Sequence, residues 1–191
     1  MIIPVIFTAE SIIAMFEIHA FDPVLYRRQT RRSTLFIALI FLSLAMLLST
    51  LAVHTWGTPG GDNLRLNIAG VAVGFLLSAL LVRQVFWSQP WMAAAVYGWR
   101  LKRNLMRVTN VMHQVEAGVS AENPEALKLL RFYHQGLSQM HQLDANTSAL
   151  SQEQRAIDAH RQRLETLGID SDQPRLDPQW LEAVKRIPVA R

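Results

Sequence analysis

The chain has 191 residues, a formal net charge of +4 and a mean hydropathy of +0.14. Hydrophobic residues make up 50% of it, which is high for a soluble protein but low for one built mostly of membrane spans. This balance fits two membrane spans attached to a polar portion. The absence of cysteine excludes a disulfide framework, a thiolate nucleophile and a cysteine-based metal site.

The N-terminal segment, residues 1–33, is predicted to be cytoplasmic. Residues 1–14 are apolar but make a poor signal peptide, because no basic residues lead them. A more ordinary polar start begins at Met15, so two interpretations stay open: Met15 is the true initiator, or the whole segment belongs to the protein. Further on, Asp22-Pro23 predicts a helix start, because Asp can cap a helix and Pro suits the first helical position.

Two apolar runs predict a transmembrane helical hairpin over residues 34–88. The first run, residues 35–53, carries no charge and spans roughly 28 Å as a helix, close to the hydrocarbon thickness of a bilayer. The second run, residues 66–87, is charged only at Arg83, which is close enough to its end for the side chain to reach the headgroups. A buried hairpin of a soluble protein is the alternative, which two such runs in succession disfavour.

Basic residues lie beside both spans, whereas the loop between the spans holds only Arg65. The positive-inside rule therefore predicts that both termini lie in the cytoplasm of a bacterial inner membrane. This clustering also predicts the lipid bilayer, and not nucleic acid, as a partner. The predicted membrane-interface anchors are Arg27, Arg28, Arg31, Arg32, Arg83, Trp87, Arg100, Lys102 and Arg103.

Small residues at intervals of four mark one face of the second span. Gly70, Gly74 and Ser78 predict a helix-packing strip, because small side chains let another helix approach closely. The partner of this strip is either the first span of the same chain, which carries Ala45 and Ser49 four residues apart, or a second copy.

Residues 89–168 are predicted to form a cytoplasmic helical domain. A helix over residues 91–117 is favoured by an apolar stripe at spacings of four and three, typical of packed helices. A second helix follows a cap at Asn123, and a third begins with capping-box spacing at Ser151. The stripes are Leu101, Leu105, Val108, Met112 and Val115 in the first helix, and Ala126, Leu130, Tyr133, Leu137 and Met140 in the second.

The predicted fold class is all-α: a two-helix transmembrane hairpin followed by a small cytoplasmic helical bundle or coiled-coil-like hairpin. Residues 169–191 are predicted to be a C-terminal tail, in which a flexible linker over 169–177 precedes a short helix opened by Asp177-Pro178. A bundle of about 80 residues has a marginal core by itself. Dimerisation or packing under the membrane is therefore expected to complete it.

Three strings carry a resemblance to a known family: LRLNIAGVAVGFLLSALL at the second span, VYGWRLKRNLMRV after it, and LRFYHQGLSQMHQLDANT in the second cytoplasmic helix. From Leu64 to about Leu150 the sequence resembles the domain of unknown function 3087 family of small bacterial two-span inner-membrane proteins. The resemblance implies a two-span protein with a cytoplasmic helical segment. It implies no activity, cofactor or site residue.

No catalytic, cofactor-binding or metal-ligating motif stands out in the sequence. His134 and His141 are seven residues apart, too far for joint metal ligation on one helix. The histidines are either a metal-binding or pH-sensing cluster or ordinary polar-face residues. The strings FYHQG and LDANT either contact a partner or serve packing and a turn. The candidate partner contacts are Phe132, Tyr133, His134, Asp144 and Asn146.

The favoured function is a membrane-anchored interaction or scaffolding module without catalytic activity. Its expected partner is a second copy or another membrane or cytoplasmic protein. The alternative is an oligomeric transport or channel accessory subunit, assembled through the strip at Gly70, Gly74 and Ser78. A membrane enzyme comes third, because no constellation of catalytic residues supports it, and no cofactor is expected.

Overall fold

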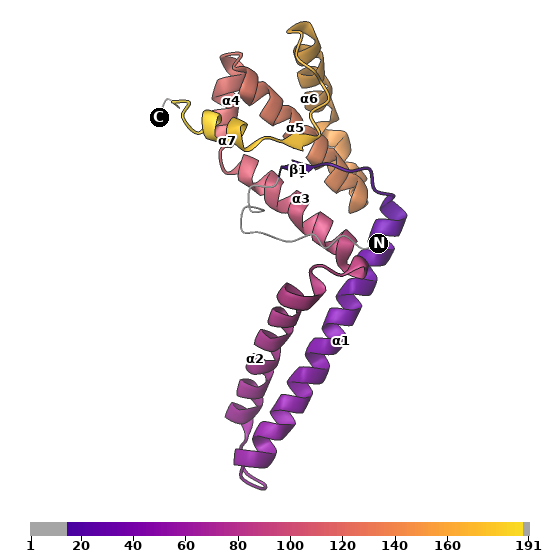
Figure 1. Cartoon of the computed structure of the whole chain (residues 1–191), viewed down its shortest axis with the longest axis vertical. Helices are drawn as coiled ribbons and strands as arrows, with labels where there is room; N and C mark the ends of the chain where they lie inside the picture. Colours follow the sequence, from indigo (N-terminus) through magenta and orange to yellow (C-terminus); the bar gives the residue numbers. More distant parts are fainter. Residues whose placement is uncertain (1–14, 189–191) are drawn as a thin grey trace, which may run out of the picture. The chain divides into compact units, whose positions relative to one another are not determined.

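The computed structural model describes residues 15–188, which belong to two units (Figure 1). The hairpin unit comprises residues 24–97, and the helical unit combines residues 15–23 with residues 98–188. Apart from two short strands, the regular structure is helical, which confirms the predicted all-α class. The elements are β1 (Phe16–Glu17), α1 (Pro23–Trp56), α2 (Leu64–Leu81), η2 (Val82–Phe86), η3 (Pro90–Met92), α3 (Ala93–Thr109), α4 (Met112–Ser120), α5 (Pro124–Leu143), α6 (Thr147–Thr166), β2 (Arg175–Leu176) and α7 (Pro178–Val184).

The hairpin unit consists of α1 and α2, which lie side by side and are joined by a short loop (Figure 1). As predicted, α1 begins at Pro23, and it continues without a break to Trp56. One π-helical turn, η2, extends α2. Both helices are long and apolar enough to cross a membrane, and only 6% and 17% of the residues in their most apolar windows are buried. A core helix of a soluble protein hides its apolar side chains, so this exposure disfavours the soluble alternative.

The loop between α1 and α2 is closed by its own polar groups. Thr58 N donates to Asn63 Oδ1 at 3.0 Å, and Asn63 Nδ2 donates back to Thr58 O at 3.1 Å. Gly60 has a φ of +72°, a left-handed conformation that glycine adopts at little cost. These local bonds turn the chain tightly enough for α2 to return along α1.

The helical unit contains two helix boundaries that differ from the prediction. The single helix expected over residues 91–117 is broken, because α3 ends at Thr109 and α4 begins at Met112. The residues at this break are Thr, Asn and Val, all of which have low helix propensity. The third cytoplasmic helix begins at Thr147, four residues before the predicted start at Ser151.

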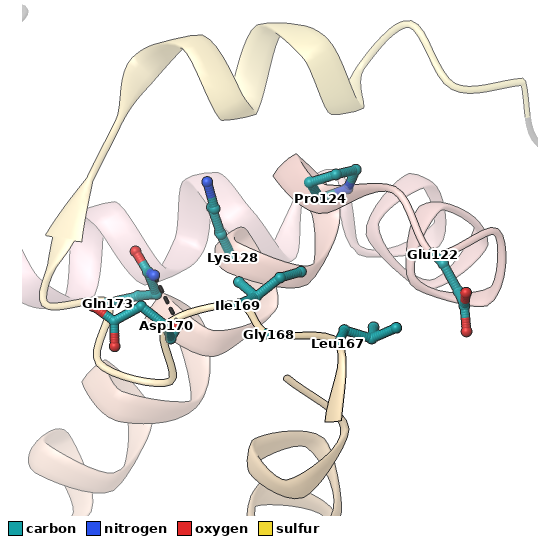
Figure 2. Close-up of a pocket in the computed structure, with 8 residues that line it drawn as sticks. All are labelled: Glu122, Pro124, Lys128, Leu167, Gly168, Ile169, Asp170 and Gln173. Atoms are coloured by element: carbon teal, nitrogen blue, oxygen red, sulfur yellow. Dashed lines mark hydrogen bonds between the residues drawn. The ribbon is translucent and has the colours of Figure 1, made fainter. Parts of the chain in front are cut away.

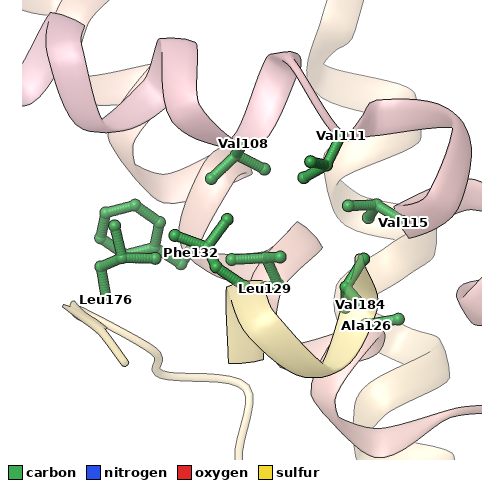
Figure 3. Close-up of a cluster of buried hydrophobic side chains, with 9 residues drawn as sticks. Val108, Val111, Val115, Ala126, Leu129, Phe132, Leu176 and Val184 are labelled. Carbon is green, nitrogen blue, oxygen red and sulfur yellow. The ribbon is translucent and has the colours of Figure 1, made fainter. Parts of the chain in front are cut away.

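The core of the helical unit is a cluster of apolar side chains from α3, α4, α5, β2 and α7 (Figure 3). Phe132 is fully buried in it and meets the ring of Phe16 edge-on, with 6.4 Å between the ring centroids. The core thus joins segments from both ends of the chain. Its members are Val108, Val111, Val115, Ala126, Leu129, Phe132, Leu176, Leu181 and Val184.

The two predicted apolar stripes differ in how many of their residues are buried. Four of the predicted positions in α3 and α4 are buried, and Met112 is half-buried. In α5, Ala126 is buried as predicted, and Leu130 and Tyr133 are half-buried against the core, but the buried residues Leu129, Phe132 and Gly136 lie outside the predicted stripe. Since α5 packs against α4, α6 and α7, it is buried on several sides, and one stripe of spacing four and three does not define its interior.

The segment predicted as a flexible linker is fixed in place. Its strand β2 pairs antiparallel with β1, with Phe16 opposite Leu176. Before the strand, Arg131 Nε donates to Ser171 O at 2.6 Å, and Gln173 N donates to Gln135 Oε1 at 3.0 Å. A strand of two residues gives no periodic signal in a sequence, so its pairing could not be predicted.

The short helix α7 begins at Pro178 as predicted, and Asp177 caps it by accepting a hydrogen bond from Gln179 N at 2.8 Å. Its side chains Leu181 and Val184 are buried in the core. The structure therefore joins the predicted C-terminal tail, and the residues of β1, to the helical unit. Residues 189–191 of the tail and residues 1–14, on which the question of the initiator rests, lie outside the described residues.

Candidate functional site

The small-residue strip of α2 lies directly against α1. Gly70, Gly74 and Ser78 are all buried. A Cβ atom on Gly70 would lie 2.4 Å from Ser49 Cα, and one on Gly74 would lie 2.8 Å from Ala45 Cα. Both separations are shorter than a Cβ contact can be, so only glycine allows this approach. The strip is therefore used within the chain and is not available to a second copy.

Polar and aromatic contacts reinforce the seam between α1 and α2. Ser49 Oγ donates to Asn67 Oδ1 at 2.7 Å, across the two helices. Ser78 Oγ donates to Gly74 O at 2.8 Å, within α2, so its hydroxyl is satisfied although it is buried. The rings of Phe41 and Phe75 meet edge-on, with 6.2 Å between centroids. The hydroxyls of both serines thus have hydrogen-bond partners within the hairpin unit.

Trp91 contacts residues of both α1 and η2 in the hairpin unit. Ser33 is 1% exposed, and its Oγ lies 2.8 Å from Trp91 O and 3.0 Å from Gln29 O. The indole of Trp91 lies 6.0 Å from the ring of Phe36 and 5.4 Å from that of Phe86, measured between centroids. These contacts hold the segment after η2, at Trp91, against α1 near Ser33 and Phe36.

The predicted interface anchors lie on the first turns of α1, on or just after η2, and on α3. Among them, Lys102 has a protein partner, since its Nζ lies 2.8 Å from Asp144 Oδ2. Those that are exposed are Arg28, Arg31, Arg32, Arg83, Arg100, Lys102 and Arg103, whereas Arg27 and Trp87 are half-buried.

The candidate partner contacts have roles inside the chain. Phe132 is fully buried, which makes it a core residue and leaves it no surface for a partner. Tyr133 packs against the same core, and Asp144 pairs with Lys102. Asn146 is exposed, and its Oδ1 accepts a hydrogen bond from Ser148 Oγ at 3.1 Å. Of these residues, Asp144 and Asn146 are exposed, and both lie in the connection between α5 and α6.

His134 pairs with a histidine that the sequence did not single out. Its ring meets that of His160, on α6, at 5.3 Å between centroids and at 81°. His160 Nε2 donates to Leu127 O at 3.0 Å, because a carbonyl oxygen can only accept. His134 Nδ1 is buried and has no hydrogen-bond partner among the described residues. The pair lies on the seam between α5 and α6.

Burial lowers the pKa of His134 from its ordinary value of 6.5 to about 4, and the charges of His160 and Arg131 act in the same direction. Burial also lowers the pKa of His160, against the hydrogen bond to Leu127 O. Protonation of either ring would place a charge in a desolvated seam beside Arg131.

Acid is therefore expected to destabilise the helical unit. As the pH falls from 6.5 to about 4, the unfolded chain binds a proton at His134 that the folded chain does not bind, so the free energy of unfolding decreases across this range. Thermal unfolding of the full chain in detergent, followed by circular dichroism, measures the effect. His134→Leu should flatten the dependence, whereas His113→Leu, at an exposed position, should not. Identical pH profiles for the wild type and His134→Leu would contradict this assignment.

A second polar pair lies further along the same seam. His141 Nε2 and Glu153 Oε2 lie 4.0 Å apart, too far for a hydrogen bond, and both atoms are buried without a hydrogen-bond partner among the described residues. His134 and His141 are seven residues apart on α5, as are Glu153 and His160 on α6. In two antiparallel helices, equal spacings can place His134 opposite His160 and His141 opposite Glu153. This equal spacing is the sequence signal that could have revealed both pairs.

A shallow pocket of about 470 Å³ lies beside the end of α6. Figure 2 shows its apolar side chains between charged groups at either end. Gln173 Nε2 donates to Asp170 O at 2.8 Å on its wall, and Glu122 Oε1 lies 3.3 Å from Arg163 Nη2 on its rim. The pocket is lined by Glu122, Pro124, Lys128, Leu167, Gly168, Ile169, Asp170 and Gln173.

These groups do not make a reaction centre that we can assign. Within residues 15–188, no three His, Asp or Glu side chains gather closely enough to hold a metal ion. The pocket holds Lys128 with the carboxylates Glu122 and Asp170, and the histidine pair is enclosed between helices. The geometry thus offers buried contacts between helices and a shallow pocket at the surface.

The chain matches, over residues 16–181, the model of a family described as "Protein of unknown function (DUF3087)". The chain belongs to this family. DUF3087 membership confirms the resemblance found at residues 64–150 and extends it over most of the chain, including β1, β2 and the first part of α7. No curated protein and no solved structure matches the chain. The description of the DUF3087 family assigns no activity.

Proposed function

We propose that the chain is a membrane-anchored interaction protein of the bacterial inner membrane, in which the hairpin unit is the anchor and the helical unit works in the cytoplasm. The observation that carries this proposal is the seam of the hairpin, where the small and polar side chains face each other. Large apolar side chains point outward: Leu42 is 59% exposed, Met46 76% and Phe75 60%. Such a surface is costly in water and suited to lipid tails.

The pairing of β1 with β2 supports an even number of crossings. β1 precedes α1, and β2 follows α6, yet the two strands share a ladder in the helical unit. This ladder favours an arrangement in which the chain before the hairpin and the chain after it lie on one side of the membrane, as two spans allow. Arg28, Arg31 and Arg32 lie in the first turns of α1, whereas Arg65 is the one Lys or Arg residue beside the loop at the start of α2, and this asymmetry favours the cytoplasm as that side.

The proposed role is binding and not catalysis. The rim of the shallow pocket carries Leu167, which is 39% exposed, and this is where we expect a second copy or another membrane or cytoplasmic protein to make contact. A channel accessory has less support, because Gly70 and Gly74 are occupied by α1 of the same chain. A membrane enzyme lacks a described set of reacting groups.

Single-cysteine variants of this cysteine-free chain test the proposal in cells. Pro59→Cys, in the loop, should react with a membrane-impermeant maleimide in intact spheroplasts. Leu167→Cys should react only after the membrane is opened, because the helical unit is expected inside. The opposite pattern, or equal labelling of both sites before permeabilisation, would contradict the proposed orientation.

The same variants report binding. A photoactivated crosslinker attached to Leu167→Cys should yield one adduct of defined mass in opened membranes, identified by mass spectrometry as a second copy or another protein. Gln162→Cys, exposed on α6 away from the pocket lining, is the matched control and should yield no such adduct. A Leu167→Cys chain that gives no adduct above the control would count against an interaction role for this surface.

A further inference from the structure

The part of α3 that belongs to the helical unit has two distinct faces. Leu101, Leu105 and Val108 are buried, at 1%, 4% and 0% exposure. On the opposite side, Trp99 is 46% exposed and Met106 is 64% exposed. These two residues are seven positions apart, which places them two turns apart on one face of the helix. Large apolar side chains thus project from α3 away from the core.

The same outward region is basic. α3 contains Arg100, Lys102, Arg103 and Arg107 and no acidic residue. The charge of Lys102 is matched by Asp144 at 2.8 Å, whereas Arg100 and Arg103 have no ion pair within the described part of the chain. The guanidinium of Arg103 lies over the indole of Trp99, 4.9 Å from the ring centroid.

Acidic groups near this region are few and engaged elsewhere. The lowered pKa of Glu182 on α7 comes first from its hydrogen bond with Lys185 and then from the charge of Lys185, and Arg107 makes a smaller contribution. Lys185 Nζ lies 2.6 Å from Glu182 Oε1. The outward face of α3 therefore keeps an excess of positive charge around Trp99 and Met106.

We propose that this face of α3, made by Trp99, Arg100, Arg103, Met106 and Arg107, binds the headgroups of anionic phospholipids. An indole and a thioether between arginines match the bilayer interface, where the apolar groups enter the headgroup layer and the guanidinium groups meet phosphate. The excess of positive charge selects lipids of negative charge.

This inference rests on the proposed membrane anchoring. If η2 ends a membrane span, the short chain from Phe86 to Trp99 holds α3 within reach of the headgroups, whatever the angle between the two units. A soluble acidic protein would match the charge of α3 but would gain nothing from this tether. The lipid surface is the occupant that both the charge and the tether favour.

Full-length single-cysteine chains in lipid nanodiscs test the inference. A fluorophore on Met106→Cys should be quenched by lipids spin-labelled near the headgroup when the nanodisc contains phosphatidylglycerol. Quenching should be much weaker in pure phosphatidylcholine. High salt should abolish the quenching seen with phosphatidylglycerol. Changing Arg100 or Arg103 to Gln should lower the ratio of bound to free α3 about fivefold per residue.

Labels at two further positions distinguish a failure of lipid binding by α3 from a failure of the proposed membrane anchor. A fluorophore on Leu42→Cys, midway along α1, should be quenched by lipids spin-labelled deep in the acyl chain in both nanodiscs, and one on Gln162→Cys should be quenched in neither. If Leu42 is quenched but Met106 is not, the lipid role of α3 is overturned and the anchor stands. If Leu42 is not quenched, the anchor itself fails. Equal quenching of Met106 in both lipids would overturn the selection for negative charge.

Discussion

A chain that stops after Gly168 is expected to lose the fold of the helical unit, although α3 to α6 remain in its sequence. The truncation removes Leu176, Leu181 and Val184, which are 2%, 2% and 0% exposed in the core. Burial of three such side chains contributes roughly 4–9 kcal/mol, which is comparable with the whole stability of a typical domain, about 5–15 kcal/mol. Circular dichroism melts and limited proteolysis of the truncated chain in detergent measure the loss.

The matched control stops after Pro188 and keeps every described contact of α7, so its melting temperature should equal that of the full chain. Leu181→Ala should destabilise the unit by about 2–5 kcal/mol. Lys185→Ala, at the exposed residue that follows α7, should cost less than about 1 kcal/mol. A chain ending at Gly168 that resists protease as well as the full chain would show that the C-terminal segment is dispensable.

Gly70→Ile should separate the two helices of the hairpin unit. Its first added atom would lie 2.4 Å from Ser49 Cα and 2.5 Å from Ser49 N, and backbone atoms cannot move aside as a flexible side chain does. Overpacking typically costs about 1–3 kcal/mol, and a clash with backbone belongs at or above the upper end of that range. Unfolding in mixed micelles with increasing dodecyl sulfate, followed by circular dichroism, measures this loss.

The matched control is Ala72→Ile on the exposed face of α2, which should leave the unfolding curve unchanged. The effect of Gly70→Ile should also be independent of the protein-to-detergent ratio, because the contact lies within one chain. A loss of stability that disappears on dilution would indicate contact between copies, and it would revive the channel alternative.

The hairpin could be predicted from the sequence because its signals are local. An apolar run of sufficient length defines each span, and the intervals between Gly70, Gly74 and Ser78 define a face without knowledge of the partner. Ala45 and Ser49 in the first span are also four residues apart, so the small residues on both sides of the contact between α1 and α2 could be found in the sequence. What the spacing could not decide was whether the partner was the same chain, which the short loop and the close approach settle.

The helical unit was less predictable because its determinants are distant in sequence. Leu129 and Phe132 are interior only because α7 and β2 return to cover them. Likewise, His160 becomes notable only when α6 folds back along α5 and brings its ring to His134. Helix starts with local caps, at Asn123 and Asp177, were predicted correctly, since the capping side chain and the donor it meets are neighbours in sequence.

The ladder between β1 and β2 sets an order of events in biosynthesis. Phe16 emerges from the ribosome well before its partner Leu176, so the helical unit cannot close until the hairpin and the helices between them have been made. The entropic cost of joining such distant segments falls if the intervening hairpin has already inserted and returned the chain to its starting side. If the hairpin is the membrane anchor proposed above, insertion of its first helix alone would leave β1 and β2 in different compartments. Completion of the helical unit would then depend on both helices having entered the membrane.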